Sequence, residues 1–148
     1  MEVIRRLANL DDAARLFEVR RKSILDLAPE GMSVAEAETW AAKLTLSGME
    51  RKLREFEIWV VELDGVVAGW GAIRGDYLEG LYTIPEFSCR GVGTDLLKLL
   101  EGLMLERGVH TVRAEASVNA EEFYVRRGYR RTAPQTPDGA IPIIKQLS

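Results

Sequence analysis

Residues 81–94 read Leu-Tyr-Thr-Ile-Pro-Glu-Phe-Ser-Cys-Arg-Gly-Val-Gly-Thr, and this stretch decides the fold class. A β-branched and aromatic run ends at Pro85, and a short loop then leads to Gly91 and Gly93. Apolar residues follow at helical spacing to about Arg107, which predicts an amphipathic helix. Glycines let the backbone approach a ligand closely, and a helix N-terminus presents unpaired N–H groups and a positive dipole. The stretch therefore predicts a strand–loop–helix seat for a phosphate-bearing ligand.

The spacing in this loop excludes two common phosphate-binding motifs. The residue three positions after Gly93 is Leu96, so the chain lacks the third small residue of a dinucleotide fingerprint. No Gly-Lys-Ser/Thr triplet follows, so it is not an ATP-type P-loop. Taken alone, the loop is equally compatible with a tight strand-to-helix turn that binds nothing.

The rest of the chain predicts a mixed α/β domain of the α+β type, built on one sheet. Asp64-Gly65, between two β-branched runs, indicates a hairpin. A helix is expected from Ala13 to about Asp26, broken by residues 29–31, and Asn119 is expected to cap a short helix. The remaining expected elements are a helix over 33–44 and strands over 3–7, 58–63, 66–74, 77–84, 109–117, 129–132 and 141–145.

Composition limits the classes of function. A chain of 148 residues is the size of one domain, so 1–148 is expected to form a single domain. The formal charge of −3 gives no support to a nucleic-acid partner. With a single cysteine, Cys89, and a single histidine, His110, no internal disulfide is available and a metal cluster is disfavoured. No apolar run is long enough for a signal peptide or a membrane span, so we expect a cytoplasmic protein without a membrane partner.

A second motif lies at residues 119–129, which read Asn-Ala-Glu-Glu-Phe-Tyr-Val-Arg-Arg-Gly-Tyr. With Leu81–Glu86 and Gly91-Val92-Gly93, it resembles the GNAT superfamily of N-acetyltransferases over nearly the whole chain. The family loop usually begins with Arg or Gln, where this chain has Ser88. Because such loops bind pyrophosphate mostly through backbone amides, this departure weakens the match without removing it, and Arg90 supplies a nearby positive charge.

The resemblance implies a mostly antiparallel mixed sheet with helices on both faces and a splayed pair of central strands. It implies acetyl-CoA as cosubstrate and no metal. The activity would be acetyl transfer to a primary amine of a small molecule or peptide, by direct transfer in a ternary complex. A homodimer is frequent in the family and stays open here.

The same resemblance assigns the site residues. The backbone of Tyr82, Thr83 and Ile84 would bind the pantetheine and the thioester carbonyl, and Tyr124 would protonate the leaving thiolate. Glu79 is placed on the face of Leu81 and Thr83 by strand alternation and is the candidate base, although a solvated glutamate explains it equally well. The other residues assigned to the coenzyme are Ser88, Cys89, Arg90, Gly91, Val92, Gly93, Thr94 and Asn119.

Two other functions stay open at this point. One is a non-catalytic module that senses acetyl-CoA. The other is an acyltransferase that uses another acyl-CoA or a hydroxyl acceptor. The identity of the acceptor amine is not encoded in any motif that we find.

Overall fold

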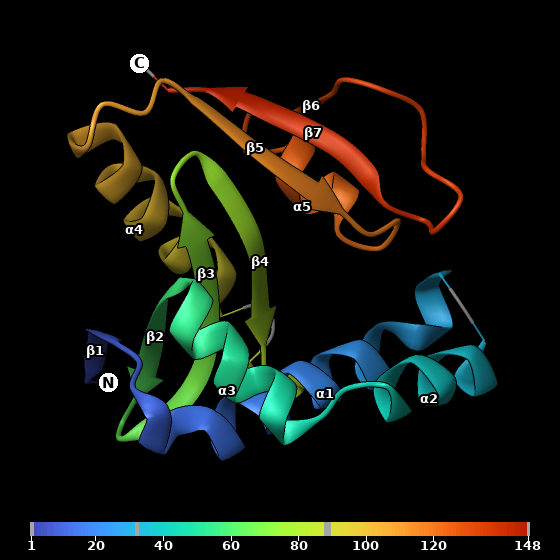
Figure 1. The fold of residues 1–148 in the computed structure, drawn as a ribbon. Coiled ribbons are helices and arrows are strands. Elements are labelled where there is room, and N and C mark those ends of the chain that lie inside the picture. The colour runs from blue at the N-terminus through green and yellow to red at the C-terminus, as the bar shows by residue number, and fades with distance from the viewer. Residues whose placement is uncertain (1, 32, 88–89, 148) are drawn as a thin grey trace.

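The computed structural model describes residues 2–31, 33–87 and 90–147, and the side chains of these residues except 27–31, 37 and 40. Its seven strands form one sheet in the order β1-β2-β3-β4-β5-β7-β6 (Figure 1). All neighbouring strands are antiparallel except β4 and β5, which are parallel. The strands are β1 (Val3–Leu7), β2 (Glu57–Leu63), β3 (Val66–Arg74), β4 (Tyr77–Thr83), β5 (Thr111–Ala116), β6 (Arg130–Arg131) and β7 (Ile141–Gln146). The predicted mixed α/β class is confirmed.

Helices cover both faces of the sheet. On one face lie α1 (Ala13–Gly31) and α3 (Leu46–Glu55), with α2 (Val34–Ala42) packed against α1, and on the other lie α4 (Val92–Glu106) and α5 (Glu121–Val125). Short 3-10 turns occupy Leu10–Asp12 and Pro85–Phe87. In the described part of the chain, no helix combines the length and the apolar character needed to cross a bilayer.

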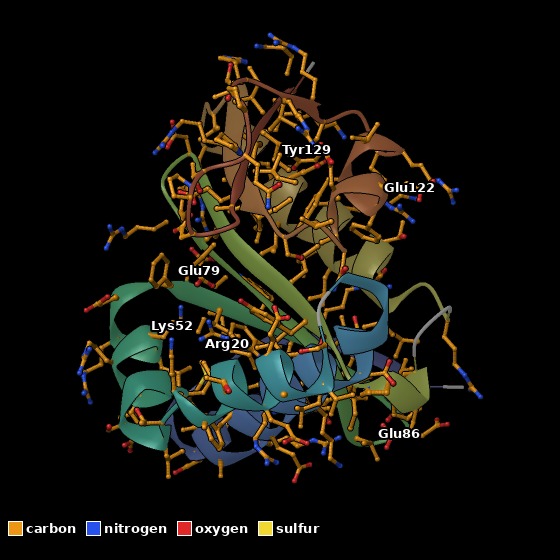
Figure 2. All side chains as sticks on the ribbon, turned by 90° about the vertical axis from the view of Figure 1, so that its right-hand side faces the viewer. Arg20, Lys52, Glu79, Glu86, Glu122 and Tyr129 are labelled. Carbon is orange, nitrogen blue, oxygen red and sulfur yellow. The ribbon has the colours of Figure 1, made fainter. Side chains whose placement is uncertain are left out.

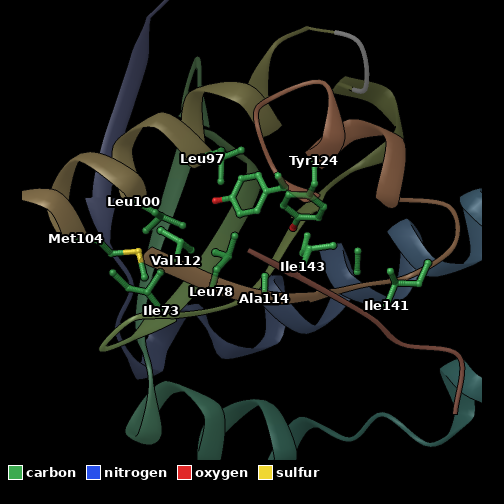
Figure 3. Packing of buried hydrophobic residues seen from close by; sticks show 12 residues of the cluster. Ile73, Leu78, Leu97, Leu100, Met104, Val112, Ala114, Tyr124, Ile141 and Ile143 are labelled. Carbon is green, nitrogen blue, oxygen red and sulfur yellow. The ribbon is translucent and has the colours of Figure 1, made fainter. Parts of the chain in front are cut away.

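Each face has its own apolar core. Under α1 and α3, Trp70 is fully buried, and its indole nitrogen donates to the Leu16 carbonyl at 3.0 Å, which fixes α1 on β3. Under α4, Leu100 and Leu97 pack against Leu78 and the inward side chains of β5 and β7 (Figure 3). Because β4 packs against a core on each of its two faces, this strand has little freedom to move.

The central strands β4 and β5 separate after a short contact. Only Tyr77 with Arg113 and Leu78 with Ala114 are paired, at one end of the two strands. Beyond them the two strands diverge, while β5 continues its antiparallel pairing with β7 (Figure 1). The end of β4 from Glu79 onward is therefore open on the side of β5, which leaves main-chain groups available to a ligand.

Three local expectations were wrong. Helix α1 continues through Pro29 to Gly31, although Pro29 has no N–H for the bond to the carbonyl four residues earlier, and the helix ends two residues after it. Helix α3 was not expected, although the Thr45 side chain caps it by accepting from the Gly48 amide at 3.0 Å. Helix α5 has Ala120 at its N-cap, with no side-chain cap, so Asn119 does not cap it.

Candidate active site

A cavity of about 980 Å³ lies where β4 and β5 separate. Its walls come from four parts of the molecule: α1 with α2, the end of β4, the end of β5 with the start of α5, and the loop before β7. The residues that line it include Arg20, Glu36, Lys43, Glu79, Gly80, Leu81, Tyr82, Glu115, Asn119, Tyr124 and Asp138. The cavity joins residues that are as far apart in the sequence as α1 and the C-terminal loop.

The backbone of β4 turns alternate groups toward this cavity. The Ile84 amide donates to the Ala68 carbonyl at 2.9 Å, so residue 84 is bonded to β3. In an antiparallel ladder the hydrogen-bonded pairs alternate, and the register pairs Tyr82 with Trp70 and Thr83 with Gly69. Tyr82 therefore faces β3 with its main chain, as Ile84 does. The main-chain groups of Leu81 and Thr83 point the other way, toward the gap.

The loop after β4 leads into the N-terminus of α4. Gly91 is the N-cap at φ +78°, a left-handed conformation that favours glycine, and no side chain caps the helix start. The first-turn amides of Val92, Gly93 and Thr94 therefore have no helical acceptor. Ser88 and Cys89 lie outside the described residues. Arg90 is exposed, with its guanidinium 5.8 Å from the Phe87 ring centroid.

Helix α5 is fixed to this helix start. A Cβ at Gly93 would lie 3.3 Å from the Phe123 ring, so any other residue there would require the ring to shift by a few tenths of an ångström. Arg127 stacks on the same ring at 3.8 Å and donates from two nitrogens to the Thr94 hydroxyl at 2.7 and 3.0 Å. The position of Tyr124, one residue after Phe123, is thus tied to the loop and α4.

Tyr124 is 5% exposed and lines the cavity, as Asn119 does. Its ring makes edge contacts with Phe123 and Tyr129, both with centroids 5.3 Å apart. Burial raises the pKa of the Tyr124 hydroxyl above its usual value, and nearby Tyr82, Glu79 and Tyr77 raise it further. The phenol consequently keeps its proton at neutral pH and is available as a donor.

Glu79 lies at a β-bulge. Ala72 pairs with Gly80 and Ile73 with Leu78, so Glu79 has no partner residue on β3. A bulge interrupts the alternation of side chains and re-aims the extra residue. The expectation that Glu79 shares a face with Leu81 was therefore wrong: Leu81 packs with the α4 core, whereas Glu79 faces α3.

Lys52 on α3 is the ion-pair partner of Glu79. Its Nζ lies 2.5 Å from Glu79 Oε1, and both side chains are largely buried (Figure 2). The other carboxylate oxygen, Glu79 Oε2, is buried and has no hydrogen-bond partner among the described residues. One oxygen of the candidate base is thus held in place, and the other is left unused.

Arg20 and Tyr82 complete this end of the cavity. The Arg20 guanidinium lies 5.3 Å from the Tyr82 ring centroid. Burial raises the pKa of Tyr82 to about 12, and the Glu79 charge adds to the shift, while Arg20 opposes it through its charge and a hydrogen bond. Burial is thus the main cause of the raised Tyr82 pKa, and the charges of Glu79 and Arg20 act on it in opposite directions. Figure 2 shows Arg20, Lys52 and Glu79 gathered in this region.

The structure brings Glu79, Tyr82, Asn119 and Tyr124 to one cavity. Among the described residues, Thr83, Ile84 and the start of α4 do not line this cavity. Lys52 was missed by sequence reasoning because α3 was missed. The signal was present: Thr45 as a cap, followed by Met49 and Leu53 at apolar helical spacing.

Comparison with known proteins identifies the family. The model of the acetyltransferase (GNAT) domain family matches residues 25–145. The chain therefore belongs to the GNAT acetyltransferases. A relative described as the uncharacterized N-acetyltransferase YafP of Escherichia coli K12 is 24% identical over 124 residues, covering 84% of this chain and 79% of that one.

Solved structures agree with this fold. A GCN5-related N-acetyltransferase from Rhodopseudomonas palustris superposes with a TM-score of 0.87 at 28% identity, covering 99% of this chain and 97% of that chain. The PaiA N-acetyltransferase of Thermoplasma acidophilum, solved with coenzyme A, gives 0.83 at 20% identity over 99% and 100% of the two chains. YncA of Salmonella typhimurium, solved with acetyl-CoA, gives 0.67 at 21% identity over 100% and 95%. The likeness to the last two shows the fold, and both of these structures contain the coenzyme.

Proposed function

We propose that the chain is an acetyl-CoA-dependent N-acetyltransferase that acetylates a primary amine of a small molecule or peptide, with residues 1–148 acting as a single catalytic domain. The observation that carries this proposal is the cavity between the diverging strands β4 and β5, which is lined by both Tyr124 and Glu79. A hydroxyl donor and a carboxylate acceptor at one cavity are what acetyl transfer to an amine requires.

Several features of the chain fit acetyl-CoA. Gly91 provides a left-handed turn, no described residue beyond its neighbours lies within 4 Å of its Cβ position, and the first-turn amides of α4 are free of helical acceptors. We propose that Val92, Gly93 and Thr94 hold the pyrophosphate through these amides, with Arg90 at the edge. Main-chain groups of Leu81 and Thr83 would bind the pantetheine and the thioester carbonyl. The sequence-based assignment named Tyr82, Thr83 and Ile84. The main chain of Tyr82 and Ile84 faces β3, where the Ile84 amide is bonded to Ala68, so this proposal uses Leu81 in their place.

The acetyl thioester supplies the group that is transferred. The amine nitrogen forms a bond to the acetyl carbon, the carbon–sulfur bond breaks, and the sulfur keeps the electron pair. In our proposal Glu79 Oε2, directly or through water, accepts the proton that the ammonium must lose before attack. The nitrogen becomes positively charged in the attack and releases its second proton to solvent as the amide forms. Tyr124 donates a proton to the sulfur and is reprotonated from solvent. No acyl-enzyme is formed, so both substrates are bound together.

The test of this function is a steady-state assay with acetyl-CoA and a panel of primary amines. We expect release of the free coenzyme thiol that depends on the amine, together with a product heavier than the amine by one acetyl group. Turnover with longer acyl thioesters at equal efficiency would favour the broader acyltransferase. Tight binding of acetyl-CoA without turnover of any amine would favour a sensing module.

Glu79→Gln is expected to lower kcat at neutral pH by about 10-fold, less than the roughly 100-fold or more that a positioned base typically contributes, since solvent also accepts the proton. The deficit should shrink as the pH rises toward the pKa of the amine itself. At that pH the acceptor is already neutral and no longer needs a base. Initial rates across the pH range, at saturating acetyl-CoA, measure this effect.

The matched control is Glu115→Gln, which removes a carboxylate that lines the same cavity but is exposed. Its kcat should stay within about 2-fold of the wild-type value, because an exposed charge is screened by solvent. Equal rates for Glu79→Gln and the wild-type protein at every pH would leave solvent as the base and remove Glu79 from the proton path.

A further inference from the structure

Two side chains of opposite charge at this cavity each have a polar atom that is buried and unpaired. These atoms are Arg20 Nε and Glu79 Oε2, and neither has a hydrogen-bond partner among the residues that the structure describes. Both side chains line the cavity together with Tyr82, and the charges of both act on the Tyr82 hydroxyl. A buried polar group without a partner costs free energy, and a bound ligand is one source of the missing partner.

The charges at this end of the cavity do not balance. Lys52 neutralises Glu79 through the 2.5 Å ion pair. Across the described side chains, no carboxylate lies within ion-pair distance of Arg20, so its positive charge is left over. The exposed rim of the cavity is acidic instead, because it carries the three carboxylates of Glu36, Glu115 and Asp138 and one lysine, Lys43. An anionic group is therefore favoured beside Arg20, while the acidic rim favours the approach of a molecule that carries an ammonium group.

We propose that the acceptor is an aminocarboxylate, a molecule with a carboxylate as well as the amine that is acetylated, of which an amino acid is the simplest case. This inference rests on the proposed N-acetyltransferase function and deepens it. The Arg20 guanidinium pairs with the carboxylate, since its planar fork of donors matches two carboxylate oxygens. Glu79 Oε2 accepts from the amine, which places the nitrogen at the group that takes its proton. Because both atoms are buried, this binding requires rotations of the two side chains that turn them toward the ligand.

A simple amine or a polyamine fits this arrangement less well. Either would leave the Arg20 charge unpaired, and a second ammonium next to Arg20 would be repelled. A site built to bond a polar group discriminates strongly against analogues that lack the group, because its own donors are then left unpaired. The ratio of efficiencies between an amino acid and its decarboxylated amine is therefore the informative quantity.

The experiment compares kcat/KM within matched pairs: lysine and cadaverine, histidine and histamine, tryptophan and tryptamine, phenylalanine and phenethylamine, with spermidine as a polyamine. In at least one pair we expect the wild-type protein to prefer the amino acid by about 100-fold, mainly through KM. Arg20→Gln should reduce this preference to less than about 5-fold. Arg20→Lys should retain part of it, since the charge stays while the fork is lost. Arg21→Gln, at an exposed neighbour on the same helix that does not line the cavity, should retain all of it.

Equal efficiency within every pair, turnover confined to amines without a carboxylate, or no turnover of any aminocarboxylate by protein that binds acetyl-CoA would each overturn the inference. An equal fall in kcat for all amines in Arg20→Gln would also overturn it, because Arg20 would then act on the acetyl carbonyl. Failure of the proposed function is separately visible, since the folded wild-type protein would then either not bind acetyl-CoA in a calorimetric titration or release no coenzyme thiol with any amine, with or without a carboxylate.

Discussion

Tyr124→Phe should lower kcat about 100-fold while leaving the affinity for acetyl-CoA nearly unchanged. The substitution removes one hydroxyl and keeps the ring, which is 5% exposed and packs edge-on against Phe123 and Tyr129. The fold is therefore retained. What is lost is the proton donor for the sulfur as the carbon–sulfur bond breaks. Steady-state rates and a calorimetric titration with acetyl-CoA separate the two quantities.

The control for this variant is Tyr129→Phe. The Tyr129 ring lies in the same cluster, but its hydroxyl donates to Glu101 at 2.7 Å and the residue does not line the cavity. We expect a modest loss of stability, because Lys145 still holds the Glu101 carboxylate at 2.8 Å, and kcat close to that of the wild-type protein. Equal kcat for Tyr124→Phe and Tyr129→Phe would remove Tyr124 from the mechanism.

Gly91→Glu should weaken acetyl-CoA binding by at least about 100-fold, since it places a negative charge where helix-end amides attract anions. A side chain at φ +78° is also strained, although among the described residues no atom beyond the adjacent residues lies within 4 Å of the Cβ position. The dissociation constant from calorimetry measures the effect, and a thermal melt verifies that the variant is folded.

Two further variants separate charge from strain. Gly108→Glu makes the same substitution at φ +87°, also in open space, at the other end of α4. It should bind acetyl-CoA as the wild-type protein does. Gly91→Lys keeps the strain and reverses the charge, so it should bind more tightly than Gly91→Glu. Equal affinities for Gly91→Glu and Gly108→Glu would place the pyrophosphate elsewhere.

Much of the fold could be predicted from local signals. The period of apolar residues, the Asp64-Gly65 hairpin and the loop at Gly91 locate most elements to within a few residues. The parallel pairing of β4 with β5 could be expected only through the family resemblance, because no local signal specifies which strands are neighbours. Two motifs of the resemblance, residues 81–94 and 119–129, also belong to elements that border the cavity or its edge.

The parts of the site that could not be predicted depend on tertiary structure. The bulge at Glu79 is created by the register between β3 and β4, and it turns the side chain to the face opposite the predicted one. The pairing of Glu79 with Lys52 depends on where α3 packs, and the bond from Ile84 to Ala68 depends on the phase of the ladder. None of these features can be inferred from a local sequence pattern. Strand alternation alone therefore predicted the wrong face of the sheet for the Glu79 side chain.

The most direct test of the central claim is a calorimetric titration of the wild-type protein with acetyl-CoA, with NADH as the control. We predict saturable binding of acetyl-CoA at micromolar concentration and no binding of NADH, because the loop lacks the third glycine or alanine of a dinucleotide site. Such a result would justify the search for the acceptor among aminocarboxylates. A folded protein that does not bind acetyl-CoA would contradict the proposed function.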